Sequence, residues 1–132
     1  MLFPCLRESG FLEIGCGPGA AAREISKRIG TGHILAIDRS EKAIQQAIAG
    51  SQSEIKSGRL SFRHVAAENF ELEKGEEHFD IAFVIRVGAL DGRHAEIEAQ
   101  VLTKIAKALK ENGKLFIDGA NAYYLSHPLY KT

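Results

Sequence analysis

The string EIGCGPG, residues 13–19, is the most informative part of this sequence. It follows the short apolar run of residues 11–14 and leads directly into a segment with helical spacing. Glycines let the backbone turn tightly and let a ligand approach where a β-carbon would block it. Free amides at the start of the next helix favour negative charge. The pattern predicts a strand, a ligand-binding glycine loop and a helix, although with Ala20 it also satisfies the dinucleotide form G-x-G-x-x-A.

A second feature of the same kind is Asp38, which ends the apolar run of residues 33–37 and lies 19 residues after Gly19. A carboxylate at this place can accept hydrogen bonds from both ribose hydroxyls of an adenosine. The alternative is a helix cap, because a helix start follows at residues 39–41. We favour ribose binding, since the loop, the distance and the strand end agree. These features alone do not separate a nicotinamide cofactor from S-adenosylmethionine.

Outward from this site, apolar runs alternate with amphipathic segments along the chain. Further strands are expected at residues 60–65, 79–85 and 115–117. Helices are expected near residues 22–29, 41–48 and 97–109, the first with Arg23 on its polar outer side and the last ended by Asn112-Gly113. The alternation predicts one α/β domain over residues 1–132: a doubly wound, Rossmann-like, mainly parallel sheet of about five strands with flanking helices.

The composition is that of an ordinary globular protein without a charge bias. Apolar residues make up 45%, and Lys+Arg and Asp+Glu balance at 17 each. We therefore expect no nucleic-acid partner and no membrane partner. Cys5 and Cys16 lack metal-ligand spacing and fit a reducing compartment, so no metal is expected, and Cys16 is interpreted as a small apolar filler. The absence of a signal-peptide pattern or a membrane-length apolar run predicts a cytoplasmic location.

Four strings carry a resemblance to a known family: FLEIGCGPGAAAREI, ILAIDRSEKAIQQA, AAENFELEKGEEHFDIAFVI and LTKIAKALKENGKLFID. Their order, over roughly residues 10–118, resembles that of the class I S-adenosylmethionine-dependent methyltransferases in a short, core-only version. The likeness is greatest to the small-molecule branch, which includes enzymes of the quinone-biosynthesis type. It implies S-adenosylmethionine as the cofactor and a small molecule as the methyl acceptor.

The resemblance also implies which residues contact the cofactor. Glu13 would lie near the positive amino group of the methionine moiety. An acid has no purpose beside a pyrophosphate, so Glu13 favours S-adenosylmethionine over NAD. Gly15, Gly17 and Gly19 would line the methionine and ribose portions, and Asp38 would hold the ribose.

The remaining implied contacts lie after the second, third and fourth strands. Arg39, or the helix start behind it, would lie beside the adenine. Ala67 would meet the adenine edge through its backbone, next to Glu68. Ile85 and Arg86 would border the methionine and the transferred methyl group.

No catalytic residue is assigned, because methyl transfer from a sulfonium depends mainly on positioning the acceptor. Asp91, Arg93 and His94 follow the fourth strand, and His94 is the best candidate for a base, although a surface histidine is the commoner case. Many relatives carry an acid where this chain has Ala66. Because this chain has no acid at that position, we expect weaker adenine binding, by on the order of 1 kcal/mol.

Three functional hypotheses remain. Methyl transfer to a small molecule is the leading one, and a non-catalytic S-adenosylmethionine-binding or partner-stabilising subunit is the alternative. An NAD-dependent oxidoreductase is less favoured, because no Tyr-x-x-x-Lys pair follows the fourth strand. Relatives usually carry an N-terminal helical lid and a C-terminal antiparallel hairpin, which we expect this chain to lack. An uncovered fifth strand exposes an edge that homodimerisation would relieve, so a homodimer is a further hypothesis.

Overall fold

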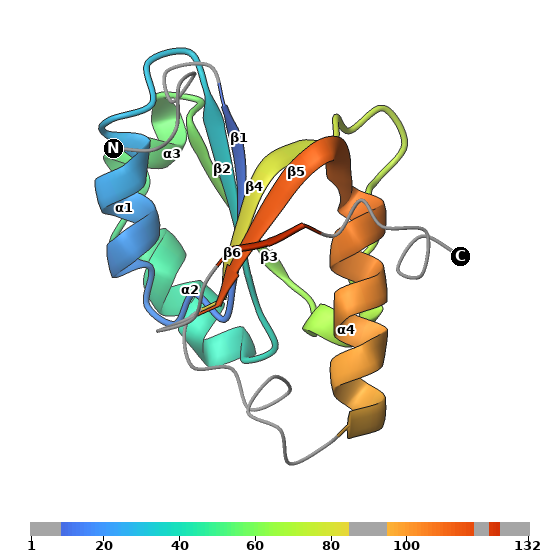
Figure 1. Cartoon of the computed structure of the whole chain (residues 1–132). Coiled ribbons are helices and arrows are strands. Elements are labelled where there is room, and N and C mark those ends of the chain that lie inside the picture. Colours follow the sequence, from blue (N-terminus) through green and yellow to red (C-terminus); the bar gives the residue numbers. More distant parts are fainter. Residues whose placement is uncertain (1–8, 85–94, 118–121, 125–132) are drawn as a thin grey trace.

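The computed structural model describes residues 9–84, 95–117 and 122–124, and its strands and helices alternate along the chain (Figure 1). The first half contains β1 (Gly10–Ile14), α1 (Ala20–Ser26), β2 (His33–Asp38), α2 (Glu41–Ala49), α3 (Gln52–Lys56) and β3 (Leu60–His64). The second half contains the 3-10 turn η2 (Ala67–Asn69), β4 (Phe79–Val84), α4 (Ala95–Ala108), β5 (Leu109–Ile117) and β6 (Ala122–Tyr124).

The strands form a single sheet in the order β3-β2-β1-β4-β5-β6. The pairs from β3 to β5 are all parallel, so the predicted doubly wound parallel sheet is confirmed. The order reverses between β1 and β4, which are neighbours in the sheet although two strands separate them in sequence. Ligands of open α/β sheets bind outside the carboxyl ends of the strands at such a reversal.

The short strand β6 is an element that the sequence analysis did not anticipate. It pairs antiparallel with β5, and Phe116 lies opposite Ala122. Pairing of this kind satisfies backbone groups that would otherwise stay exposed at a sheet edge. The edge from which a homodimer was inferred is therefore paired along part of its length, and homodimerisation stays a prediction.

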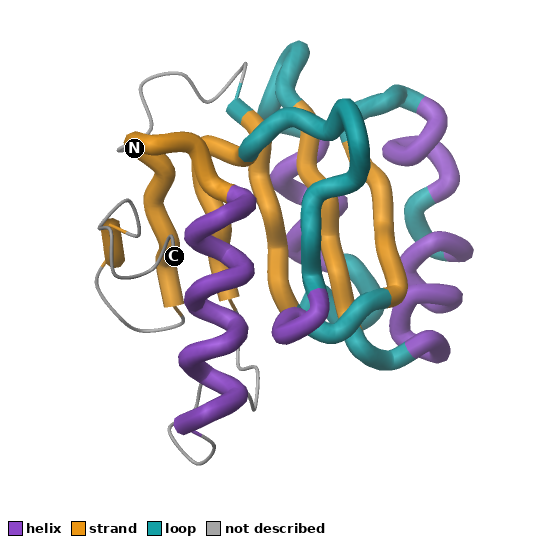
Figure 2. The backbone as a smooth tube through the Cα atoms, turned by 90° about the vertical axis from the view of Figure 1, so that its right-hand side faces the viewer, coloured by secondary structure: helices purple, strands orange, loops and turns teal. Residues whose placement is uncertain are grey.

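The helices cover both faces of the sheet. In Figures 1 and 2, α1, α2 and α3 lie on one side of the strands and α4 lies on the other. Because side chains alternate along a strand, each face contributes its own apolar layer. In the part of the chain that the structure describes, no helix is both long and apolar enough to cross a bilayer.

Each apolar layer mixes strand residues with the inner stripe of the helices above it. The layer beneath α4 includes Leu12, Ile14, Leu35, Ile37, Val84, Val101, Ile105 and Leu115. The layer beneath α1 and α2 includes Phe11, Ala22, Ile34, Ala36, Ile44 and Ile81. The central strand β1 thus contributes to both layers, which holds the loop that follows it on a rigid base.

The end of α4 differs from the prediction. The Asn112-Gly113 pair predicted the end of this helix, but α4 ends at Ala108 and β5 begins at Leu109. Phe79 pairs with Leu109 and Ile81 with Lys114, so the backbone of β5 bulges between them. A β-carbon at Gly113 would lie 2.7 Å from Cβ of Leu109. The glycine therefore permits a close approach within the bulge and does not cap the helix.

Truncating the central strand should cost far more stability than truncating the helix surface. Leu12 is fully buried, whereas Ile48 is 39% exposed on α2. We expect Leu12→Ala to lower the free energy of unfolding by about 2–5 kcal/mol. We expect Ile48→Ala to lower it by less than about 1 kcal/mol. Urea unfolding of both variants measures the two values, and equal losses would contradict this description of the core.

Candidate functional site

The carboxyl ends of β1, β2 and β4 meet at one edge of the sheet. Ile14, near the end of β1, pairs with Ile37 of β2 and with Val84 of β4. The glycine loop of residues 15–19 leaves the sheet at this edge, and Asp38 ends β2 beside it. The structure therefore brings together the two features from which the site was inferred.

The loop begins with a bond between the ends of the two strands. The amides of Gly15 and Cys16 both donate to the carbonyl oxygen of Ile37, at 2.9 and 3.0 Å. Because two successive amides share this one acceptor, the chain turns sharply at the end of β1. Gly15 has a φ of 76°, in the left-handed region that favours glycine.

The rest of the loop is also bonded within the protein. The amide of Gly17 donates to Oδ2 of Asp38 at 2.9 Å, and the amide of Gly19 donates to the carbonyl of Cys16 at 3.1 Å. Pro18 has no N–H to donate. Each N–H of residues 15–19 thus has a protein acceptor.

Asp38 links the loop to the turn before α2. Its Oδ2 accepts from Gly17, and its Oδ1 accepts from the amide of Ser40 at 2.8 Å. The helix cap is Ser40, whose hydroxyl accepts from the amide of Ala43 at 3.1 Å. A carboxylate has about four lone-pair sites, so two remain on Asp38. Asp38 is therefore not the N-cap of α2, and it keeps acceptor capacity at the sheet edge.

Glu13 is a buried carboxyl group on β1, only 1% exposed. Its register partners on the neighbouring strands are Ala36 and Phe83, which are apolar. Its Oε1 has no hydrogen-bond partner. Burial, together with the charge of Asp38, raises the pKa of Glu13 to about 7.

Cys16 lies in the same loop and is buried. Burial raises the pKa of its thiol to about 12, with further contributions from the charges of Glu13 and Asp38. A thiol that stays protonated is a poor nucleophile. The structure supports its interpretation as a small apolar filler.

The expected adenine-side residues follow β2 and β3 along the chain. Arg39 and Glu68 form an ion pair across the ends of β2 and η2, with 3.4 Å between Nη2 and Oε2. Ala67 is buried within η2. Ile85 and Arg86 lie outside the described residues, as do Asp91, Arg93 and His94.

Sequence reasoning missed one residue at this edge. Arg23 was placed on the polar outer side of α1, but its Nη1 donates to the carbonyl of Pro18 at 2.8 Å and to Oγ of Ser51 at 3.0 Å. Helical spacing gives only the inner and outer sides of a helix. No signal in the sequence places the turn between α2 and α3 within reach of this guanidinium.

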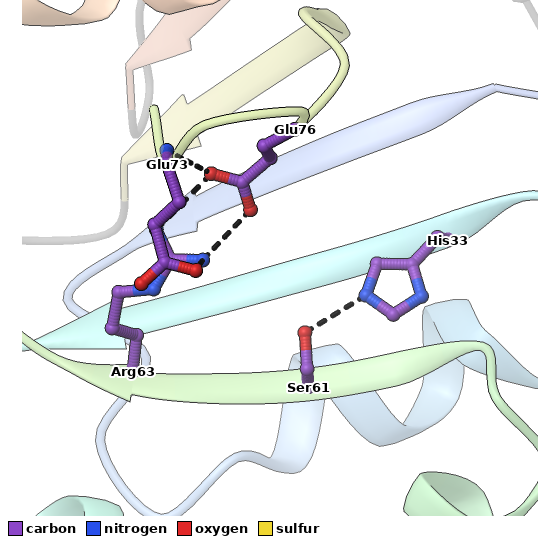
Figure 3. Close-up of polar contacts among 5 residues, drawn as sticks. All are labelled: His33, Ser61, Arg63, Glu73 and Glu76. Atoms are coloured by element: carbon purple, nitrogen blue, oxygen red, sulfur yellow. Dashed lines mark hydrogen bonds and ion pairs between the residues drawn. The ribbon is translucent and has the colours of Figure 1, made fainter. Parts of the chain in front are cut away.

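A cavity of about 260 Å³ lies at the opposite, amino-terminal edge of the sheet, and His33, Asp80 and Lys110 are among the residues that line it. Asp80 accepts from the amide of Gly10 at 2.8 Å and pairs with Lys110 at 3.0 Å. His33 contacts Oγ of Ser61 at 2.8 Å (Figure 3). We assign the candidate site to the carboxyl edge, because the glycine loop, Asp38 and the unpartnered Oε1 of Glu13 lie there.

Glu76, which also lines this cavity, forms an ion pair with Arg63. Arg63 of β3 pairs with both Glu73 and Glu76 (Figure 3). Its Nη2 lies 2.7 Å from Oε2 of Glu76 and 3.4 Å from Oε1 of Glu73. These contacts hold the segment before β4 against β3. Among the described residues, no group of three or more His, Cys, Asp or Glu side chains could hold a metal ion.

The sequence profile of a family described as a methyltransferase domain matches residues 7–131. None of the curated protein sequences matches the chain.

Solved structures share the fold. PKMT2 from Rickettsia typhi, in complex with AdoHcy, is 21% identical with a TM-score of 0.72, over 86% of this chain and 21% of that one. The O-methyltransferase of a trans-AT PKS multienzyme of Brevibacillus brevis, in complex with S-adenosyl-L-homocysteine, is 14% identical with a TM-score of 0.70, over 84% and 35%. The cyclase SpnF is 23% identical with a TM-score of 0.69, over 83% and 38%. The chain thus spans less than two fifths of each of these neighbours.

The buried charge of Glu13 should make stability depend on pH. Its pKa rises from 4.5 to about 7 on folding, so the stability it contributes is complete below pH 4.5 and is lost as the pH rises through 7. The loss is on the order of 3 kcal/mol, at about 1.4 kcal/mol for each pKa unit. Glu13→Gln removes the charge, so its stability relative to the unsubstituted protein should rise by this amount between about pH 4.5 and pH 8, as measured by urea unfolding.

Glu71→Gln is the matched control. The Glu71 side chain is 72% exposed, and its hydrogen bond with Lys104 lowers its pKa. A carboxyl group whose pKa is 4.5 when unfolded and lower when folded is ionised in both states above about pH 5.5. The stability of Glu71→Gln relative to the unsubstituted protein should therefore stay constant from about pH 5.5 to pH 8, where that of Glu13→Gln still rises. The same constancy in Glu13→Gln would show that Glu13 is not buried as a carboxylate.

Proposed function

This chain belongs to the methyltransferase domain family, and we propose that it binds S-adenosylmethionine at the carboxyl edge of its sheet and transfers the methyl group to a small molecule. The observation that carries the proposal is the buried Glu13 carboxylate, with an unpartnered oxygen, at the sheet edge that holds Asp38. The family match and the class I sheet order agree with it.

Glu13 fits the positively charged amino group of the methionine moiety. An uncompensated buried carboxylate is costly, and a cation with hydrogen-bond donors offsets that cost. Ala36 and Phe83 beside it are apolar and offer no such donor. A ligand ammonium would therefore supply what the protein lacks at this position.

Asp38 fits the ribose. Each of its oxygens accepts one backbone amide, from Gly17 and from Ser40, and keeps a free lone pair. Two hydroxyls on adjacent carbons match two acceptors on one carboxylate. The backbone bonds also fix the orientation of the carboxylate before any ligand arrives, which lowers the entropic cost of binding.

The loop itself is better suited to a nucleoside than to a pyrophosphate. Dinucleotide sites present free backbone amides to the phosphates. Here the amides of residues 15–17 and 19 donate to protein acceptors. This supports S-adenosylmethionine over NAD, and it argues against the oxidoreductase hypothesis.

The adenine would lie on the far side of Asp38. The resemblance implies Arg39, Ala67 and Glu68 as neighbours of the adenine, and the ion pair between Arg39 and Glu68 supports this. Ile85 and Arg86 are proposed to border the methionine and the methyl group on the same resemblance.

S-adenosylmethionine supplies a methyl group on a positively charged sulfur, which is already activated for transfer. The residues of this chain then have to hold and orient the cofactor and keep its charged groups paired. Positioning of this kind supplies much of the rate of a two-reactant step. An acceptor such as a hydroxyl loses a proton on methylation, to solvent or to a base, and no residue is assigned to that step.

The reaction depends on more than this fold. One of the solved neighbours is named as a cyclase. Such names show that a shared fold does not fix a reaction. A non-catalytic subunit that binds S-adenosylmethionine is therefore the second outcome that the experiments below have to distinguish.

Replacing Asp38 should weaken cofactor binding selectively. Asp38→Asn keeps the volume and loses the charge and one acceptor. Hydrogen bonds to a charged group contribute about 1.5–3 kcal/mol, so the Kd for S-adenosylhomocysteine should rise about 10- to 100-fold in calorimetric titration.

Asp80→Asn is the matched control, because Asp80 also accepts a strand-end amide, from Gly10, but at the opposite edge of the sheet. Its Kd should stay within about twofold of the unsubstituted value. NAD should bind to none of the three proteins. Equal losses in both variants, or no binding of S-adenosylhomocysteine by the folded chain, would contradict the proposed site.

Methyl transfer is tested separately from binding. The chain is incubated with S-adenosylmethionine and a panel of small metabolites bearing hydroxyl, amino or activated carbon groups, and S-adenosylhomocysteine is measured by mass spectrometry. We expect S-adenosylhomocysteine to form with at least one acceptor and to decline in Asp38→Asn. Binding without product across the panel would favour the non-catalytic subunit.

A further inference from the structure

We propose that Arg23 is a positioning residue for the cofactor loop, and that it fixes the orientation of the peptide between Pro18 and Gly19. The inference rests on the proposed function, since the loop matters because the cofactor would contact it. The bonds of Arg23 themselves are a property of the protein without ligand.

Arg23 connects three parts of the chain. Its Nη1 donates to the carbonyl of Pro18 in the loop, at 2.8 Å. The same atom donates to Oγ of Ser51, at 3.0 Å, in the turn between α2 and α3. Ser51 is fully buried, so this second contact gives the guanidinium a fixed point of attachment. A charged donor with two acceptors holds the loop more firmly than a neutral one would.

Two glycines leave room for this side chain. A β-carbon at Gly19 would lie 3.2 Å from Nη1 of Arg23, and one at Gly50 would lie 3.3 Å from the same atom. Both distances are tighter than ordinary van der Waals contact. Glycine at these two positions, in the loop and at the end of α2, therefore leaves space for the guanidinium of Arg23.

The peptide between Pro18 and Gly19 is held at both ends. Arg23 binds its carbonyl, and the carbonyl of Cys16 accepts its N–H at 3.1 Å. Gly19 has a φ of 90°, and glycine populates positive and negative φ about equally. The residue type therefore does not select one orientation of this peptide. The two bonds do so together, and the one from Arg23 is the bond that a side chain supplies.

Arg23 also complements Asp38. The loop is held by an anion through the N–H of Gly17 and by a cation through the carbonyl of Pro18, one residue further on. Pro18 has no N–H, so its carbonyl is the only backbone polar group that can fix it. Removal of Arg23 should leave Asp38 and β1 in place and release only the second half of the loop.

The test compares three variants. Arg23→Met removes the donor and keeps much of the apolar stem, and Arg23→Lys keeps the charge but not the planar fork. Arg28→Met is the matched control, because Arg28 lies in the turn just after α1, its side chain is 73% exposed, and its ion pair with Glu24 is long, at 3.8 Å. Calorimetry with S-adenosylhomocysteine gives the Kd at a temperature where circular dichroism shows all proteins to be folded.

In Arg23→Met we expect the Kd to rise about tenfold, as the loss of a charged hydrogen bond implies. Arg23→Lys should restore part of the affinity, and Arg28→Met should bind within about twofold of the unsubstituted protein. An unchanged Kd in Arg23→Met would overturn the inference.

A ligand-free measurement separates this inference from the proposed function. Hydrogen exchange of the Gly19 amide, followed by NMR, should be about tenfold faster in Arg23→Met, because its peptide is no longer held at the carbonyl. The amide of Leu12 should keep its rate, which shows that the core is intact. Unchanged Gly19 exchange overturns the role of Arg23 even if the cofactor binds. Faster Gly19 exchange with no cofactor binding by the unsubstituted chain supports the role of Arg23 in the loop and refutes the proposed function.

Discussion

Two backbone N–H groups, from Gly15 and Cys16, converge on the carbonyl oxygen of Ile37 where β1 and β2 end. This shared acceptor makes the chain turn across the sheet edge instead of running on beyond it. The turn brings Gly17 to the carboxylate of Asp38 and lets α1 start at once after Gly19. This tie between the two strand ends therefore brings the loop, the acid at the end of β2 and the arginine on α1 to the same edge of the sheet.

The electrostatics of the edge follow from its packing. Glu13 has an apolar neighbour on each adjacent strand and is buried, and the charge of the partly buried Asp38 adds to the effect of burial in raising the pKa of Glu13. A folded protein tolerates such a pair only at a cost in stability. Under the proposed function, the same arrangement would favour a ligand that carries a positive charge, because such a ligand relieves the repulsion. Stability and recognition therefore oppose one another at Glu13.

Much of this edge could be predicted from the sequence because local patterns determine it. Short stretches of sequence contain the glycine spacing, the apolar runs and Asp38. These patterns predicted the parallel sheet and the loop at the point where the strand order reverses. Arg23 could not be found this way, since its partner Ser51 is brought near only by tertiary packing. Gly113 was misinterpreted as a cap for a similar reason: an Asn-Gly pair fits a helix end and a strand bulge equally well. The cofactor contacts proposed for Ile85 and Arg86 remain predictions.

The central position of β1 has a consequence for how the domain melts. Strand β1 pairs with β2 on one side and with β4 on the other, and its residues enter both apolar layers. It cannot detach without exposing both layers, so opening of the loop's base and loss of the whole domain are one cooperative event. A ligand seated on that base would by mass action raise the melting temperature of the entire domain, and not only that of the loop. The carboxyl edge of the sheet would thus be coupled to the most stable part of the molecule.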